Sequence, residues 1–161
     1  MPAGEDDDGR TVTPVTFVVE LVDRCTPDVV DAFCRYEPRL SSRPSPLKPE
    51  VLARMVESHA YQLLVARNDG VIRATLTAAV YQALRGVTAR IDDVVAEQDQ
   101  EGQAAAVALV EEAIRRAGVG GADSVQLVSK PALPVANGTY ERLGFVQEGP
   151  GLYRRAIPGR S

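Results

Sequence analysis

The tripeptide Asn68-Asp69-Gly70 constrains the fold most, because it separates two apolar runs, Tyr61–Arg67 and Val71–Tyr81. Both runs are rich in the residue types that favour β-strands. Asn, Asp and Gly accept the positive φ angles that a tight hairpin turn requires. A third run of the same character, Gly86–Ala96, follows. The sequence therefore predicts strands that pair in antiparallel fashion at the centre of the chain.

Helices and further strands are predicted on both sides of this hairpin. Thr26 before Pro27, and Lys48 before Pro49, suit helix starts, because proline loses no hydrogen bond in the first turn. The full prediction adds a strand over 16–22, helices from 26 to before Pro38, 48–58 and 103–117, a short buried strand over 125–128 and a last strand over 151–157. This order predicts one mixed α/β domain over residues 15–161, preceded by a disordered acidic tail over 1–14.

Composition narrows the class of protein. A chain of 161 residues corresponds to one domain. Since it has neither a membrane-length apolar run nor a secretory start, we expect a cytoplasmic protein without a membrane partner. Cys25, Cys34 and the single His59 support neither a disulfide framework nor a metal site. We expect His59 at the surface rather than as a catalytic base.

Charge argues against a dedicated nucleic-acid surface. The net charge of −4 comes from the acidic run Glu5-Asp6-Asp7-Asp8, without which 18 acidic residues balance 18 basic ones. Sixteen of the basic residues are arginines, and local arginine patches could still hold phosphate groups.

The stretch 136–145 reads as a short amphipathic helix with a defined end. Ala136, Tyr140 and Leu143 share one helical face, whereas Glu141 and Arg142 point to water. Gly144 follows where a helix needs a residue that adopts a left-handed conformation without steric cost. Phe145 then enters the core as the chain leaves the helix.

This stretch, with Asn137, Tyr140 and Gly144-Phe145 at their spacing, resembles the C-terminal signature of the GNAT superfamily of acetyl-CoA-dependent N-acyltransferases. The resemblance extends over residues 15–157. Ile91-Asp92-Asp93-Val94-Val95 resembles the central strand that splays from its neighbour to admit the acyl thioester, and Ser129-Lys130-Pro131 resembles the start of the last helix. The implied fold is a central twisted, mostly antiparallel sheet flanked by helices, and the implied activity is N-acetyl transfer from acetyl-CoA to an amine.

The resemblance also assigns site residues. Tyr140 would protonate the leaving thiolate, and Asn137 would contact the pantetheine arm. Val94, Val95 and Ala96 would line that arm, with backbone groups of Val94 and Ala96 holding its amide and the thioester carbonyl. Asp92 and Asp93 are consecutive on a strand, so one should face the core side and the other the opposite side. Whichever faces the cleft is the candidate base.

The phosphate-binding turn departs from the family pattern, which has Arg or Gln, then Gly, then Gly or Ala at the start of the long helix. In one register this chain has Glu101, Ala104 and Ala106, and in the other it has Asp99, Gly102 and Ala104. Backbone N–H groups would remain to bind a pyrophosphate at the helix N-terminus. Those donors would come from Gly102, Gln103, Ala104, Ala105 and Ala106.

Three functions stay open on this evidence. The first is an ordinary acyl-CoA enzyme in which Arg115, Arg116 or another cation reaches the phosphates. The second is an acyltransferase whose donor is a carrier-protein thioester or an aminoacyl-tRNA. The third is a binding module that keeps the fold without catalysis.

The acceptor is also open. Arginines in the predicted loop 39–46 would suit an acceptor with a carboxylate or phosphate group. Small-molecule amines, peptide N-termini and lysine side chains all remain. Because edge strands of this fold often pair between subunits, a homodimer is also compatible with the resemblance.

Overall fold

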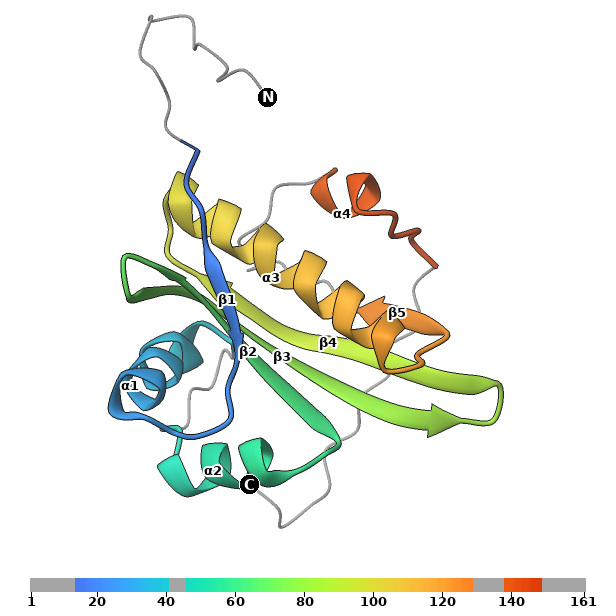
Figure 1. Ribbon diagram of the computed structural model, residues 1–161, viewed down its shortest axis with the longest axis horizontal. Coiled ribbons are helices and arrows are strands. Elements are labelled where there is room, and N and C mark those ends of the chain that lie inside the picture. The colour runs from blue at the N-terminus through green and yellow to red at the C-terminus, as the bar shows by residue number, and fades with distance from the viewer. Residues whose placement is uncertain (1–13, 41–45, 129–137, 149–161) are drawn as a thin grey trace, which may run out of the picture.

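The computed structural model describes residues 14–40, 46–128 and 138–148. Its sheet has five strands in the order β1-β2-β3-β4-β5 (Figure 1). Strands β1 to β4 are antiparallel neighbours, whereas β5 runs parallel to β4. Their bounds are Val18–Leu21, Tyr61–Asn68, Val71–Ala83, Gly86–Ala96 and Ser124–Leu127. The mixed α/β fold with a mostly antiparallel sheet is therefore confirmed.

The turn between β2 and β3 has the predicted geometry. Asp69 has φ of 47° and Gly70 has φ of 78°, so both central residues are left-handed. Two such residues match the twist of the flanking strands and close a two-residue hairpin. The local turn residues thus fix the antiparallel register of the central strands.

Helices cover both faces of the sheet (Figure 1). The first face carries α1 (Pro27–Tyr36), the 3-10 turn η1 (Glu37–Arg39) and α2 (Pro49–Glu57), and the second carries α3 (Gln100–Val119) and the short α4 (Thr139–Arg142). Pro27 and Pro49 begin their helices as predicted. The Thr26 side chain makes no cap to the backbone and donates instead to Asp28 Oδ1 at 2.5 Å.

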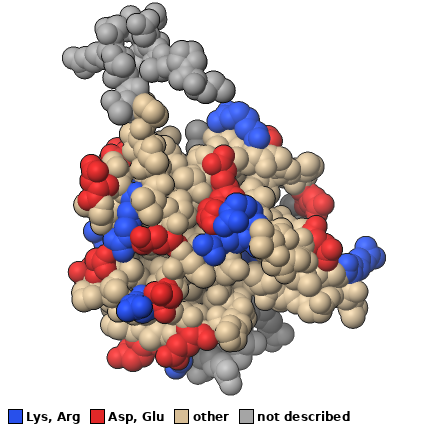
Figure 2. All heavy atoms as spheres, in the orientation of Figure 1, with Lys and Arg blue, Asp and Glu red and all other residues tan. Residues whose placement is uncertain are grey.

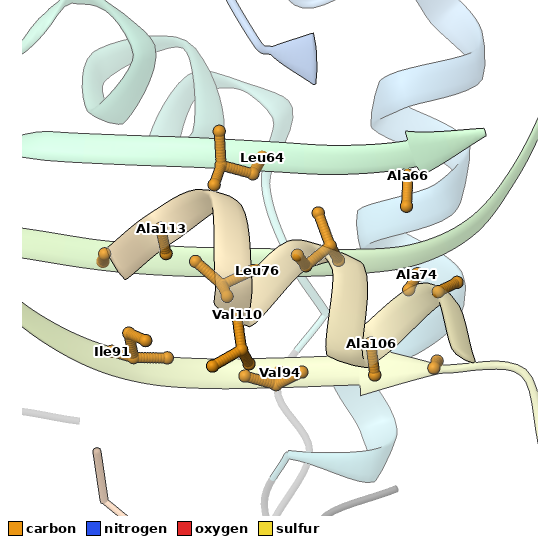
Figure 3. Packing of buried hydrophobic residues seen from close by; sticks show 13 residues of the cluster. Leu64, Ala66, Ala74, Leu76, Ile91, Val94, Ala106, Val110 and Ala113 are labelled. Atoms are coloured by element: carbon orange, nitrogen blue, oxygen red, sulfur yellow. The ribbon is translucent and has the colours of Figure 1, made fainter. Parts of the chain in front are cut away.

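The core between α3 and the sheet is close-packed. Leu64 on β2, Leu76 on β3 and Val94 on β4 point toward Ala106 and Val110 of α3 (Figure 3). Each fully buried leucine or valine contributes about 1.5–3 kcal/mol relative to an exposed one. Alanines along α3 let the helix lie close to the strands, which holds its N-terminal end at a fixed position beside the end of β4.

Strand β4 has an irregularity at its centre. Ala78 of β3 lies opposite Ile91, but the next pair is Thr77 with Asp93, so Asp92 is an extra residue on β4. Such a β-bulge bends its strand and disrupts pairing locally. The pairing of β4 with β5 ends at the same point, with Ile91 opposite Leu127 as the last pair. The two parallel strands therefore part at the bulge.

Strand β1 begins two residues later than predicted and β3 ends two residues later, and α3 and β5 differ further from the prediction. Helix α3 begins at Gln100, three residues before the predicted Gln103, for a reason given below. Strand β5 was predicted as buried, but its described residues are only partly buried or exposed, because β5 pairs on one side with β4. Apart from residue 14, the predicted tail lies outside the described residues, as do the predicted last strand over 151–157 and the stretch 129–131.

Charged side chains of both signs are interspersed over the face seen in Figure 2. On α3, Glu112 pairs with Arg115 at 2.6 Å and with Arg116 at 2.8 Å. Within the described ranges, no helix is long and apolar enough to cross a membrane.

Candidate functional site

The end of β4 presents backbone groups to the side from which β5 has departed. The Ile91 carbonyl accepts from the Val128 N–H at 3.3 Å, and the Glu97 N–H donates to the Arg73 carbonyl at 3.0 Å. Because successive strand residues direct their backbone groups to opposite edges, Val94 and Ala96 direct theirs away from β3. No described strand residue pairs with this part of β4 on that side. Among the described residues, this leaves a short open strand edge, as the resemblance led us to expect.

The two consecutive aspartates of β4 lie on one face of the sheet, which corrects the expectation that they face opposite ways. Asp92 shares a face with Arg90 and pairs with it at 2.8 Å. Asp93 accepts a hydrogen bond from Thr77 Oγ1, its cross-strand partner, at 3.1 Å. The bulge at Asp92 breaks the strict alternation of side chains, so both carboxylates lie on the face that carries α1 and α2.

Helix α4 positions Tyr140 and ends as predicted. The Phe145 N–H donates to the Tyr140 carbonyl at 2.9 Å, and the Gly144 N–H donates to the Glu141 carbonyl at 3.0 Å. Gly144 has φ of 88°, so these bonds form a Schellman cap at a left-handed glycine. The Tyr140 and Phe145 rings meet edge to face, with centroids 6.1 Å apart. The cap therefore fixes the direction of the Tyr140 side chain against the core.

The hydroxyl of Tyr140 is the most distinctive polar atom of this region. It is buried and has no hydrogen-bond partner among the described residues. Burial raises the pKa of Tyr140 to about 12. The side chain is therefore a neutral hydrogen-bond donor throughout the physiological pH range.

Asp99, the residue directly before α3, caps the first turn of this helix. The Gly102 N–H donates to Asp99 Oδ1 at 2.7 Å, and the Gln103 N–H donates to the Asp99 carbonyl at 3.1 Å. Asp99 is thus the N-cap, which explains the early start of the helix. The N–H groups from Gln103 onward bond carbonyls one turn back, so the first-turn donors are those of residues 100 to 102, not 102 to 106 as predicted.

Gly102 also permits a close approach of two backbone segments. A Cβ atom built on Gly102 would lie 1.9 Å from the Glu97 carbonyl oxygen. No side chain fits there, so the glycine serves contact between the end of β4 and α3. The cap hydrogen bond from Gly102, together with Arg73, holds the pKa of Asp99 below its ordinary value.

Arg73 neutralises much of the acidic character of this turn, and sequence reasoning did not identify it. Its Nη2 lies 2.6 Å from Asp99 Oδ2, and its Nε lies 3.0 Å from Glu101 Oε1. Asn68 Nδ2 also donates to Glu101 Oε1, at 2.9 Å. The sequence did contain an indication of Arg73. Because the predicted strands pair in antiparallel order, the first residues of β3, which include Arg73, lie beside the end of β4.

Arg115 and Arg116, considered as phosphate ligands from the sequence, lie elsewhere. They occupy the C-terminal part of α3 and pair with Glu112. At a rise of 1.5 Å per residue, Arg115 is roughly 22 Å along the helix from Gln100. The structure does not bring them to the first turn.

A groove of about 520 Å³ runs between α3 and α4. Its lining includes Gln103, Ala104, Val107, Thr139, Arg142 and Leu143. The groove thus joins the first turns of α3 to the helix that carries Tyr140. Asn137, a further predicted site residue, lies outside the described residues.

The part of the chain that the structure describes contains no group of three or more His, Cys, Asp or Glu residues that could hold a metal ion. His59 is exposed.

Strands β4 and β5 part beside the N-terminal end of α3, and Tyr140, with its buried hydroxyl, lies on α4. This is the arrangement that the resemblance implied. The chain belongs to the acetyltransferase (GNAT) family, whose family model matches residues 26–145. It is therefore a GNAT-type acetyltransferase. None of the curated proteins matches the chain.

Solved structures agree with this assignment at the level of the fold. A transcriptional regulator from Bacillus halodurans C-125 is 22% identical, with a TM-score of 0.73 over 88% of this chain and 100% of the other. A putative acetyltransferase from Agrobacterium tumefaciens str. C58 is 23% identical, with a TM-score of 0.71 over 86% of this chain and 99% of the other. Glucosamine-6-phosphate N-acetyltransferase from Arabidopsis thaliana is 20% identical, with a TM-score of 0.69 over 87% and 98%.

Proposed function

We propose that this protein transfers an acetyl group from acetyl-CoA to the amino group of a small molecule. The observation that carries the proposal is the buried hydroxyl of Tyr140, which has no hydrogen-bond partner among the described residues. A buried donor without a partner is costly, and such a group is retained when a ligand satisfies it. The sulfur of a thioester that leaves as a thiolate is a suitable partner.

The open edge of β4 would hold the acyl-pantetheine part of the donor. Val94 and Ala96 are buried, and their backbone groups face the side that β5 leaves. These groups would extend the sheet hydrogen bonding onto the pantetheine amide and orient the thioester carbonyl, with Val95 supporting the strand from the opposite face. An N–H aimed at that carbonyl would stabilise the negative charge that develops on its oxygen during attack.

The reaction would proceed by direct attack. The neutral amine forms a C–N bond with the thioester carbon, the C–S bond breaks, and one proton leaves the amine while the sulfur gains one. Because the pKa of Tyr140 is about 12 and that of a free thiol is about 8.5, complete proton transfer to the thiolate is uphill. Tyr140 would therefore act chiefly by donating a hydrogen bond to the departing sulfur, with solvent or the amine supplying the proton.

Asp92 and Asp93 would serve the acceptor side. Both lie on the face that carries α1 and α2, opposite to α3 and α4. A carboxylate there could accept the proton that the amine loses, or hold a cationic acceptor. Asp92, which pairs with Arg90, and Asp93, which accepts a hydrogen bond from Thr77, are both candidates for the base, directly or through a water molecule.

A small-molecule acceptor is the class we favour. One relative in fold is by name a glucosamine-6-phosphate N-acetyltransferase. A phosphorylated amino sugar would also suit arginines that follow α1, such as Arg39 in η1, since guanidinium binds phosphate bidentately. Peptide N-termini and lysine side chains are the competing acceptors in the test below.

A tethered donor is the second candidate, and the first turn of α3 favours it. The Asp99 carboxylate occupies the Gly102 N–H, and Glu101 adds a second acid. Both carboxylates repel the negative charge of a free pyrophosphate. The backbone N–H groups of residues 103 to 106, which the sequence led us to expect as cofactor ligands, already donate hydrogen bonds within the helix. The alternative donors are a phosphopantetheine thioester on a carrier protein and an aminoacyl-tRNA. Neither requires this turn to bind a pyrophosphate.

The test is thiol release from acetyl-CoA in the presence of amino sugars, polyamines and peptides. We expect amine-dependent thiol release and an acceptor that gains one acetyl group. Acetyl-pantetheine, which lacks the pyrophosphate, is the matched donor; equal use of both donors would favour the tethered candidate. Failure of both donors to bind or react would overturn the proposal in favour of a binding module.

Substitution of Tyr140 tests the chemical step. Tyr140→Phe should lower kcat by about 10- to 100-fold, with little change in the KM for acetyl-CoA. The loss is smaller than the roughly 10²- to 10⁴-fold typical of a full general acid, because Tyr140 donates a hydrogen bond rather than its proton. Tyr61→Phe is the control, because Tyr61 is 44% exposed on β2. Full turnover by Tyr140→Phe at saturating substrate would remove Tyr140 from the mechanism.

A further inference from the structure

Glu97, the residue directly after β4, connects α1 on one face of the sheet to α3 on the other. Tyr36 lies at the end of α1 and is only 2% exposed. Its hydroxyl donates to Glu97 Oε1 at 2.8 Å. Arg35 Nη2 lies 3.1 Å from the same oxygen and donates to the Tyr36 hydroxyl at 3.0 Å. The carboxylate of Glu97 is thus held from the side of α1.

The backbone of Glu97 supports the first turn of α3. Its N–H donates to the Arg73 carbonyl at 3.0 Å. Its carbonyl oxygen fills the space that a Cβ on Gly102 would need. A displacement of Glu97 toward α3 must therefore move Gly102, and with it the cap formed by Asp99.

We propose that Glu97 is a positioning residue for the donor, because the Tyr36 hydroxyl holds it in the place that sets the first turn of α3. The inference rests on the proposed function, in which the donor lies along that turn. It adds a residue pair that touches neither donor nor acceptor in the proposed reaction. It also assigns α1, which belongs to the acceptor face, a role in donor binding.

The hydroxyl, rather than the ring of Tyr36, makes this connection. The ring is packed in the core on the α1 face and is flanked by Arg35 and Arg39, whose Cζ atoms lie 4.8 Å and 5.8 Å from its centroid. Burial raises the pKa of Tyr36, so the hydroxyl remains a donor at neutral pH. Tyr36→Phe therefore removes one hydrogen bond to Glu97 and leaves the packing of the ring in place.

Asp28→Asn gives a matched control. Asp28 Oδ2 lies 2.6 Å from Arg67 Nη1, so this pair also ties α1 to the sheet, but it does so at β2 and makes no contact with Glu97. Both variants weaken the docking of α1. Only Tyr36→Phe removes a hydrogen bond from Glu97, whose remaining partner on α1 is Arg35.

The experiment combines amide hydrogen exchange with donor binding on the full chain. In Tyr36→Phe, exchange at the Gly102 and Gln103 amides should rise by about 5- to 10-fold, as expected when one hydrogen bond supporting a local structure is lost. The Kd and KM for acetyl-CoA should rise by about 3- to 10-fold while kcat changes by less than about two-fold, because the chemical groups are untouched. Glu97→Gln keeps an acceptor oxygen for Tyr36 and should fall between wild type and Tyr36→Phe.

Two outcomes would overturn the inference. One is unchanged exchange at Gly102 and Gln103 in Tyr36→Phe. The other is an equal rise in Asp28→Asn, which would show a general loosening of α1. If exchange rises in Tyr36→Phe alone while wild type binds acetyl-pantetheine but not acetyl-CoA, Glu97 still sets the turn, and the CoA donor of the proposed function is what fails.

Discussion

The two ends of the proposed donor site are built in different ways. At the thioester end, the open edge of β4 and the cap that fixes Tyr140 depend on strand topology and a left-handed glycine. At the other end, the first turn of α3 depends on individual charged side chains, namely Asp99, Glu101 and Arg73. Backbone geometry tolerates sequence change, because every residue has an N–H and a carbonyl group. Side-chain charge does not, because a single substitution at Asp99, Glu101 or Arg73 changes the net charge of this turn.

The largest effect in this comparison is expected at Gly102, where the two ends meet. In Gly102→Ala the new Cβ would lie 1.9 Å from the Glu97 carbonyl oxygen, a contact that backbone must move to relieve. We expect the free energy of unfolding to fall by about 3 kcal/mol, as for a severe overpacking change. Acetyl-CoA binding should weaken as well, because the first turn of α3 shifts. Chemical denaturation and calorimetry measure the two effects.

Gly118→Ala is the matched control on the same helix. A Cβ on Gly118 would meet no atom within 4 Å. Alanine there should raise the free energy of unfolding by about 0.5–1 kcal/mol through helix propensity. If Gly102→Ala were instead as stable as wild type, the contact between β4 and α3 would not constrain the turn, and the two ends would be independent.

The parts of the molecule that local residues determine could be predicted from the sequence. The hairpin at Asp69 and Gly70 and the left-handed Gly144 were predicted correctly, because each requires a residue type that few positions tolerate. The bounds of β4, Gly86–Ala96, were also predicted correctly.

Features that depend on pairing between distant segments could not be predicted in this way. The bulge at Asp92 exists only relative to β3, so the alternation rule gave the wrong faces for the two aspartates. The start of α3 was placed too late for a different, local reason, because Asp99 was considered only in the phosphate-binding turn and not as an N-cap. Arg73 is 26 residues from Asp99 in sequence, and only the hairpin register brings the two together.

The loss of stability at alkaline pH tests the burial of the Tyr140 hydroxyl, which lies at the thioester end of the proposed site. The pKa of Tyr140 is about 12 when folded and about 10 when unfolded. The folded state therefore keeps this proton while the unfolded state loses it, so stability is fully present below pH 10 and falls as pH rises toward 12. Wild type should lose about 2 kcal/mol more than Tyr140→Phe over this interval. Thermal unfolding at pH 8, 10 and 11.5 measures the difference, and parallel curves for the two proteins would mean that the hydroxyl is solvated.

The smallest expected effect tests the side-chain end of the site. Glu101→Gln removes one negative charge beside the proposed pyrophosphate while an amide oxygen still accepts from Asn68. We expect acetyl-CoA to bind about 3- to 10-fold more tightly, with the gain shrinking at high salt, since the charge is partly exposed and screened. Acetyl-pantetheine should bind equally to both proteins.

Glu112→Gln on the same helix is the control, because Glu112 pairs with Arg115 and Arg116 far from the first turn. A gain for acetyl-CoA alone would show that side-chain charge limits donor affinity, whereas no gain would mean that Arg73 already neutralises Glu101 and that the backbone governs both ends of the site.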